Sequence, residues 1–313
     1  MSAVRRDLAF VVATMDRPGP LSRLLESLAA QTVVPAEVVV VDGGAAPAAD
    51  LCWGPRPFAV RHIPFRPPST ARQRNAGLEA VSSGIAFVGF LDDDVLLEPG
   101  AVGAMMAFFD AAAAEVGGAA FNMSNHPPLR AARWKSSRFA ERAGLYGRRP
   151  GAVMKSGFQT MIGPLAADLR TDWLPSGAVV WRRDVLRRTK FDDWFADYGY
   201  LEDLDLSYRA GKSSVLVAVA GARYSHHPDA SPRPDPYRFG RKEVANRLRF
   251  VAKNPELSPA LCRLALVVRM VMSLSDGLFL GQRAELRRVR GNMAGFLGPG
   301  PGPEAARRKR NGR

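Results

Sequence analysis

The chain has only two cysteines, Cys52 and Cys262, among its 313 residues. Two thiols so far apart do not form the dense disulfide framework of a small secreted domain, which favours a reducing intracellular environment. The N-terminal sequence Met-Ser-Ala-Val-Arg-Arg-Asp runs directly into an apolar segment and shows no secretory signal. These features predict a cytoplasmic protein whose two cysteines are inert core thiols.

A long uncharged apolar run is also missing. The most apolar stretch, residues 261–280, is interrupted by Arg263, Arg269 and Asp276. A membrane-spanning helix needs about 20 consecutive, predominantly apolar residues. This stretch is therefore not expected to cross a bilayer. It suits an amphipathic helix that lies at a membrane surface or packs on the rest of the protein.

Acidic residues are scarce in the last part of the chain. The formal net charge is +14, and residues 233–313 hold 18 Lys and Arg against 6 Asp and Glu, a net charge of +12. Such asymmetry predicts an anionic partner for this part, either a membrane surface or nucleic acid. Nucleic acid would call for stacking aromatics, and from Gly240 onward only Phe250, Phe279 and Phe296 are present. We expect a membrane surface, with the protein either free in the cytoplasm or peripheral at the inner face of the membrane.

Apolar runs alternate with helical patterns in the first part of the chain. Residues 8–13, 37–41 and 85–91 read as buried strands, and leucines recur at helical spacing within residues 21–28. This alternation predicts an α/β fold with a mostly parallel sheet flanked by helices. The remaining predicted elements are strands at 58–63, 173–181 and 215–220 and helices at 69–81 and from about 202.

Prolines at 232 and 234 mark a boundary before the basic part of the chain. We predict an α/β domain over residues 1–232, a helical basic extension over 233–297, and a disordered basic tail over 298–313, which is rich in Pro, Gly, Arg and Lys.

Three consecutive aspartates, Asp92, Asp93 and Asp94, follow the predicted strand at 85–91. Alternation along a strand predicts that Asp92 and Asp94 point to one side and Asp93 to the other. Two carboxylates about 4 Å apart repel by roughly 4 kcal/mol at an effective dielectric constant of 20, which favours a bound cation. Mg²⁺ or Mn²⁺ shared with phosphate oxygens would suit the site, whereas a helix N-cap followed by solvated acids is the alternative.

Asp42 ends another predicted strand. Because the carboxyl ends of parallel strands meet at one edge of a sheet, where open α/β sheets bind ligands, we expect Asp42 and Asp92 at the same edge. The sequence thus predicts a binding site there.

Taken together, several segments resemble the family 2 glycosyltransferases of GT-A fold, over roughly residues 7–230. The resemblance rests on their order and spacing. They are Thr14-Met-Asp-Arg17-Pro, Val-Val-Val-Asp42, Ala71-Arg-Gln-Arg74-Asn75-Ala-Gly77, Leu91-Asp92-Asp93-Asp94, Ser176-Gly177 and Glu202-Asp203. Two departures from the commoner pattern, Gly-Gly after Asp42 and Thr14-Met15-Asp16 in the first loop, bear on the identity of the base.

The resemblance implies a metal-dependent hexosyl- or deoxyhexosyltransferase that moves a sugar from a nucleoside-diphosphate sugar to a hydroxyl acceptor. It implies that Asp42 and Thr14 contact the nucleotide, that Arg74 approaches its base or phosphates, and that Asp92 contacts ribose or sugar. Asp93 is the least defined member of this donor-binding set.

The resemblance also assigns a metal ligand and a catalytic pair. Asp94 would ligate the metal, with Asp92 as a further ligand. Asp203 would be the general base, ionised because a helix N-terminus lowers the pKa of an Asp, and Glu202 would hold or orient the acceptor.

Two adjacent histidines, His226 and His227, fall where some relatives supply a further metal ligand. Adjacent side chains point in different directions, so at most one of the two is expected to ligate. The basic C-terminal part suggests an acceptor that is carried on lipid or on a cell-surface glycan, as in polysaccharide biosynthesis of the cell envelope. In-line displacement with inversion at the anomeric carbon is the expected course.

Other functions explain less of the sequence. A sugar nucleotidyltransferase or a dinucleotide oxidoreductase should carry a glycine-rich phosphate loop after the first strand, and residues 14–20 are not one. A non-catalytic basic module that binds membrane or nucleic acid would explain the basic C-terminal part and nothing else.

Overall fold

The computed structural model describes residues 2–45, 48–52, 54–126, 138–195, 199–228 and 235–298. The chain divides into two compact units. The first unit contains Met1–Leu129, Ile162–Asp192 and Ala196–Asp229, and the second contains Arg130–Met161, Asp193–Phe195 and Ala230–Arg313. The domain boundaries expected from the sequence stay predictions, and the tail expected to be disordered lies outside the described residues from 299 onward.

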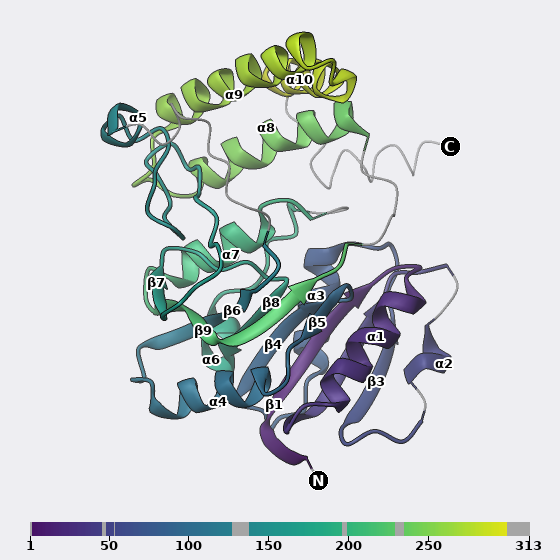
Figure 1. Ribbon diagram of the computed structural model, residues 1–313. Coiled ribbons are helices and arrows are strands. Elements are labelled where there is room, and N and C mark those ends of the chain that lie inside the picture. The colour runs from purple at the N-terminus through teal and green to yellow at the C-terminus, as the bar shows by residue number, and fades with distance from the viewer. Residues whose placement is uncertain are drawn as a thin grey trace. The chain divides into compact units, whose positions relative to one another are not determined.

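Unit 1 is built on one mixed sheet with the strand order β3-β2-β1-β4-β8-β6-β9-β5, and β7 pairs with β9 (Figure 1). Its strands are β1 (Ala3–Thr14), β2 (Val33–Asp42), β3 (Ala59–Pro64), β4 (Phe87–Asp92), β5 (Val95–Leu97), β6 (Val116–Met123), β7 (Leu169–Thr171), β8 (Ala178–Arg182) and β9 (Val215–His226). The first four strands of the order are parallel, as expected, and β8 runs antiparallel between β4 and β6.

Helices cover both faces of this sheet (Figure 1). They are α1 (Pro18–Ala29), α2 (Ala49–Cys52), α3 (Thr70–Ala80), α4 (Ala101–Ala111), α6 (Arg183–Arg188) and α7 (Glu202–Ala210). The leucines of α1 are fully buried and pack in the same core as α4, whereas α3, α6 and α7 pack on the other core. The mixed α/β fold predicted from the sequence is confirmed.

Strand β6 has no counterpart among the predicted elements. Its small residues hide the strand pattern, and the packing explains them: a Cβ added at Gly118 would lie 2.5 Å from the ring of Trp181 on β8. The strand expected at 173–181 begins only at Ala178, because residues 176–177 form a turn before it.

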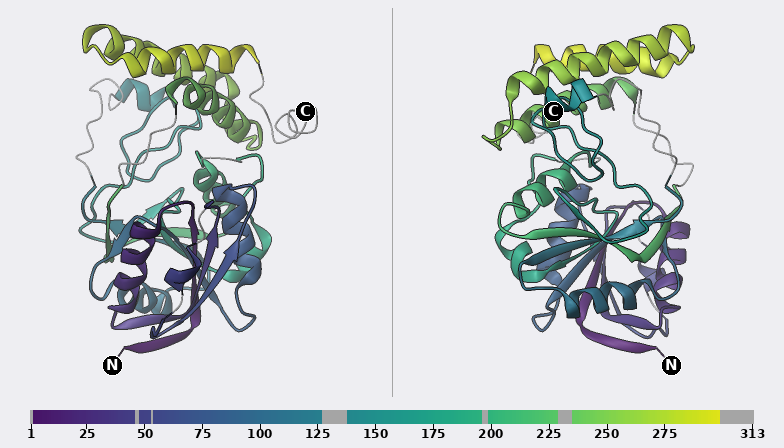
Figure 2. Two further views of the ribbon diagram at one scale, coloured as in Figure 1. Left: turned by 90° about the vertical axis from the view of Figure 1, so that its right-hand side faces the viewer. Right: turned by 60° about the vertical axis from the view of Figure 1, so that its left-hand side comes forward.

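Unit 2 is helical and contains α5 (Arg138–Arg142), α8 (Pro236–Ala252), α9 (Pro259–Phe279) and α10 (Arg283–Leu297). The last two helices lie side by side (Figure 2). The three long helices share one buried carboxylate: Glu243 of α8 accepts hydrogen bonds from Arg288 and Asn292 of α10, and Arg269 of α9 lies 3.9 Å away. As the sequence predicts, no described helix is long and apolar enough to span a bilayer.

Candidate active site

Three parallel strands carry the predicted site residues to one edge of the sheet. Thr14 of β1 is aligned with Asp42 of β2, and Ala13 is aligned with Asp92 of β4. The expectation that Asp42 and Asp92 share an edge is therefore confirmed, and Thr14 lies between them.

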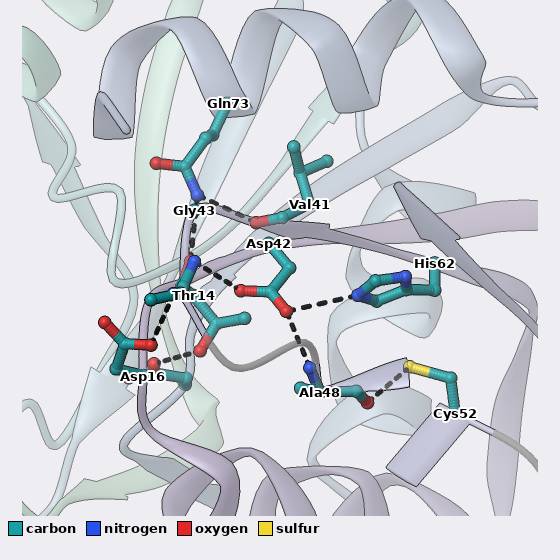
Figure 3. Close-up of polar contacts among 12 residues, drawn as sticks. Thr14, Asp16, Val41, Asp42, Gly43, Ala48, Cys52, His62 and Gln73 are labelled. Atoms are coloured by element: carbon teal, nitrogen blue, oxygen red, sulfur yellow. Dashed lines mark hydrogen bonds and ion pairs between the residues drawn. The ribbon is translucent and has the colours of Figure 1, made fainter. Parts of the chain in front are cut away.

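The carboxylate of Asp42 holds the loop that follows β2 (Figure 3). One oxygen accepts from the backbone amide of Gly44 at 2.7 Å, and the other accepts from the amide of Ala48 at 2.7 Å and lies 3.2 Å from Nε2 of His62. Burial alone would raise the pKa of Asp42, but these two amides and His62 lower it below its usual value. Asp42 is only 3% exposed, so in this structure it organises the loop. His62 had no predicted role, and no sequence signal pairs it with Asp42.

The first loop and the loop after β2 are joined at close range. Gln73 of α3 donates to the carbonyls of Thr14 and Val41 (Figure 3). A Cβ at Gly44 would lie 2.6 Å from the backbone nitrogen of Asp16, whose carboxylate accepts from the amide of Ala45. Of the Gly-Gly pair that departs from the commoner family pattern, Gly44 is thus explained by this contact between the loops, whereas a Cβ at Gly43 would lie 2.8 Å from the side chain of Pro68.

Asp93 and Asp94 share the guanidinium of Arg17, at 2.5 Å and 2.9 Å. The alternation expected for the triplet is wrong, because β4 ends at Asp92 and the next two residues form a turn. Asp93 is buried, and it also accepts from the hydroxyl of Thr14 at 2.7 Å. Burial raises the pKa of Asp93 to about 7, against the opposing effect of Thr14 and Arg17. Arg17 belongs to the segment Thr14-Met-Asp-Arg17-Pro that carries the family resemblance, but the resemblance assigns no role to it.

Asp94 also contacts His226 at the end of β9, with 3.1 Å between Oδ1 and Nε2. Burial raises the pKa of Asp94, but His226 and Arg17 outweigh it, so that the pKa of Asp94 is lowered. The hydrogen bond that His226 donates to the carboxylate of Asp94 raises the pKa of His226. His227 instead pairs its ring with the hydroxyl of Ser225. Of the two candidate histidines, only His226 brings its ring to the triplet, whereas His227 contacts it through its backbone amide, which donates to the carbonyl of Asp94 at 2.8 Å.

A carboxylate oxygen beside an imidazole nitrogen is a donor set that suits Mn²⁺ and, less well, Mg²⁺. Within the described ranges no group of three or more His, Cys, Asp and Glu side chains is arranged to hold a metal. A metal held by Asp94 and His226 would therefore need further ligands from another source, such as a phosphate group.

Arg74 of α3 is buried and bridges two carboxylates. It lies 2.7 Å from Asp92 and 3.1 Å from Glu202, and its guanidinium is 5.5 Å from the ring centre of Phe191. Burial lowers the pKa of Arg74, but Asp92, Glu202 and Asp203 outweigh it and raise it. Arg74 thus fixes Asp92 against the start of α7, while the side chain of Asp92 stays 40% exposed.

Asp203 follows Glu202 in the first turn of α7 and is partly exposed. Burial of the carboxyl group, together with the charge of Glu202, raises its pKa to about 7, although the amide of Leu204 and the charge of Arg74 lower it. The expectation that the helix N-terminus keeps this pKa low is wrong, because desolvation and a neighbouring carboxylate outweigh the helix dipole. Asp203 is therefore poised to take up or release a proton near neutral pH.

The turn at Ser176 and Gly177 completes this side of the site. The amide of Asp92 donates to the carbonyl of Gly177 at 2.8 Å, and a Cβ at Gly177 would lie 3.0 Å from the carboxylate of Asp92. The turn expected from the sequence thus lies directly against the triplet.

Comparisons with known proteins identify the family and the fold. A family model described as "Glycosyl transferase family 2" matches residues 9–166. Among solved structures, the fold is similar to that of S. aureus TarS 1-349 in complex with UDP-GlcNAc, with a TM-score of 0.52 and 16% identity over 83% of this chain and 70% of that chain. A second structure of S. aureus TarS 1-349 matches at a TM-score of 0.49 and 15% identity, over 83% of this chain and 69% of that one. No curated protein matches the sequence.

Proposed function

The chain belongs to glycosyl transferase family 2 and has the GT-A fold, and from this premise we propose that it transfers a sugar from a nucleoside-diphosphate sugar to a hydroxyl acceptor with inversion at the anomeric carbon. The observation that best supports the proposal is Asp203, a partly exposed residue that follows Glu202, which Arg74 links to Asp92 at the end of β4. Burial of its carboxyl group raises the pKa of Asp203 to about 7.

Asp203 is the proposed general base. The acceptor oxygen attacks the anomeric carbon, the bond from that carbon to the diphosphate oxygen breaks, and the hydroxyl proton passes to the carboxylate of Asp203. A catalytic base works best when its pKa lies near the operating pH, and a pKa of about 7 meets this condition. Glu202, held by Arg74, orients the acceptor beside it.

The donor would lie over the ends of β1, β2 and β4. Thr14, Asp42, Arg74, Asp92 and Asp93 are the proposed donor-binding residues. Asp42 acts through the loop that it holds, and Arg74 acts by positioning Asp92, whose side chain is the most exposed of the triplet. Arg17, which contacts Asp93 and Asp94, adds a positive charge that suits a diphosphate.

A divalent cation would be held by Asp94 and His226. Asp92, two residues before Asp94, would be a further ligand. When bound, Mg²⁺ or Mn²⁺ supplies charge neutralisation to the departing diphosphate. For that role His226 has to give up the proton that its contact with Asp94 favours.

TarS was crystallised with UDP-GlcNAc, which makes that compound the first donor to test here. The proposed acceptor is a lipid-linked or cell-surface glycan, because residues 233–313 carry a net charge of +12, which suits an anionic membrane surface. Peripheral association with the inner face of the cell membrane is part of the same proposal.

The test is release of nucleoside diphosphate from a panel of UDP-, GDP-, CDP- and dTDP-sugars with Mn²⁺, with Mg²⁺ and with EDTA. Asp203→Asn should reduce turnover by about 10²- to 10⁴-fold while donor binding, measured by calorimetry, is kept. The control is Asp184→Asn on α6, an exposed carboxylate paired with Arg188, which should keep full activity.

Asp94→Ala should abolish the metal-dependent part of nucleotide binding. Metal-dependent binding that survives this change would remove Asp94 from the metal site, and turnover that survives Asp203→Asn would remove the proposed base. Product with retained anomeric configuration would exclude direct displacement.

A further inference from the structure

The outer face of α9 carries an unbroken stripe of large apolar side chains. Leu264, Val267, Val271, Leu274 and Leu278 recur every three or four residues and are between 41% and 62% exposed. Isolated exposed apolar residues are ordinary, whereas a contiguous stripe along four turns of one helix indicates an interaction surface.

The stripe ends in an apolar tip. Leu278, Phe279 and Leu280 are consecutive and are 62%, 83% and 66% exposed. Gly281, at a φ of 67°, then turns the chain into α10, where Arg283 is exposed. Three adjacent large apolar residues followed by a basic one form a tip whose apolar side chains lack cover within the described part of the chain.

The opposite face of α9 fixes the helix in this orientation. Cys262, Leu266 and Gly277 are buried, and a Cβ at Gly277 would lie 2.4 Å from Leu286 of α10. Because this face is already packed, the helix cannot turn its stripe inward without breaking those contacts.

Charge around the stripe is positive. The exposed positions of α9 include one charged residue, Arg263, while Arg269 and Asp276 are half-buried. On α10, Arg283, Arg287 and Arg290 are exposed, and Arg287 pairs with Asp235. A surface that combines apolar side chains with a local excess of basic residues fits an anionic lipid bilayer.

We propose that the stripe of α9 and the tip at residues 278–280 insert into the interface of an anionic membrane, with the arginines of α10 near the lipid headgroups. The binding depends only on this surface. Its purpose, which is to bring the active site to a membrane-carried acceptor, rests on the proposed function.

A second copy of the chain is the other occupant that an apolar helix face could take, and the tip argues against it. Successive residues of a helix are about 100° apart, so residues 278–280 span roughly 200° around the axis. The contact between two packed helices covers only one side of each helix, whereas lipid can cover the side chains of residues 278, 279 and 280 together. The stripe also lacks exposed acids on α9 that could pair with Arg263 of a partner copy.

The test uses the full chain and vesicles of phosphatidylcholine, with and without 30% phosphatidylglycerol. We expect co-sedimentation with the anionic vesicles only, reduced by salt. Phe279→Ser combined with Leu280→Ser should weaken the partition coefficient at least tenfold. Val4→Ser, which changes a 48% exposed residue on β1, is the control and should leave binding unchanged. Thermal melts check that each variant is folded.

Insertion is measured directly on a labelled chain. Phe279→Cys places an exposed thiol on the tip, while Cys52 and Cys262 are buried and burial raises the pKa of both, so the label goes to position 279. A fluorophore there should be quenched by brominated lipids, and the same label on Val4→Cys should not.

The proposal is overturned if the protein does not bind anionic vesicles, or if brominated lipids quench the fluorophore equally at positions 279 and 4. Light scattering could instead show that the wild type is a dimer, that the tip variant is a monomer, and that neither binds vesicles. That result would assign the surface to a second copy of the chain and would also overturn the membrane proposal. Donor turnover in vesicle-free buffer is measured on the same preparations, so failure of the glycosyltransferase proposal is seen separately.

Discussion

Replacing Arg74 by methionine tests how the site is held together. Arg74 is buried between Asp92 and Glu202, so Arg74→Met leaves the carboxylate of Glu202, which is 9% exposed, without its ion-pair partner. The carboxylate of Asp92 is 40% exposed and stays solvated. Removing one partner of a buried ion pair costs about 3–5 kcal/mol, and we expect a loss of that size in the free energy of unfolding, measured by urea denaturation.

The same change should alter the pH dependence of turnover. The charge of Arg74 lowers the pKa of Asp203, which lies at about 7 in its presence. Without that charge the pKa rises, and because the base must be ionised, the rising limb of the pH–rate profile moves to higher pH. A shift of one unit would lower the ionised fraction at pH 7 by about fivefold. Arg74→Lys keeps the positive charge but not the planar guanidinium group, so it should lose stability. The rising limb of its pH–rate profile should move less than that of Arg74→Met.

Arg5 offers a matched control, because it bridges Asp7 and Asp110 in a similar way near the other end of β1. Its side chain is 25% exposed, and exposed pairs contribute about 0–1 kcal/mol. Arg5→Met should therefore lose little stability and leave the pH–rate profile unchanged. The role assigned to Arg74 is refuted if Arg74→Met has the same denaturation midpoint as the wild type and the rising limb of its pH–rate profile does not move.

Three further changes probe other parts of the structure. The folded-state pKa of Asp203 lies above its ordinary value, so the folded state becomes less stable as pH rises from about 4 to 7. At pH 8, Asp203→Asn should therefore be more stable than the wild type by at most ~4 kcal/mol. Urea titrations that show no such gain at pH 8 relative to pH 4 would contradict this. Gly44→Ala should weaken nucleotide binding and lower the melting temperature, because its Cβ would lie only 2.6 Å from the backbone nitrogen of Asp16 in the first loop. Gly84→Ala is the control and should be neutral in the same assays, because a Cβ at Gly84 has no atom within 4 Å. Glu243→Gln should destabilise unit 2 by about 3–5 kcal/mol because it removes the buried carboxylate charge that Arg288 of α10 contacts at 2.7 Å, while the longer contact of Arg288 with Glu285 stays. An unchanged melting profile would show that the network is not required.

Much of the fold was predictable because its signals are local. The apolar runs of β1, β2 and β4 and the leucine spacing of α1 identify a parallel βαβ arrangement, and parallel strands bring their carboxyl ends to one edge. Strand β6 was not predictable in this way, because its small residues are explained only by packing against Trp181.

The sequence by itself predicted that Asp42 and Asp92 lie at one edge of the sheet, because each follows a strand pattern, whereas Asp203 was assigned to the site only by the family resemblance. Only the tertiary structure shows which groups each of these carboxylates contacts. Arg17 reaches Asp93 across 76 positions and Arg74 reaches Glu202 across 128, and no local pattern encodes such pairs. Desolvation likewise depends on everything packed around a group, which is why burial, and not the helix N-terminus, sets the pKa of Asp203.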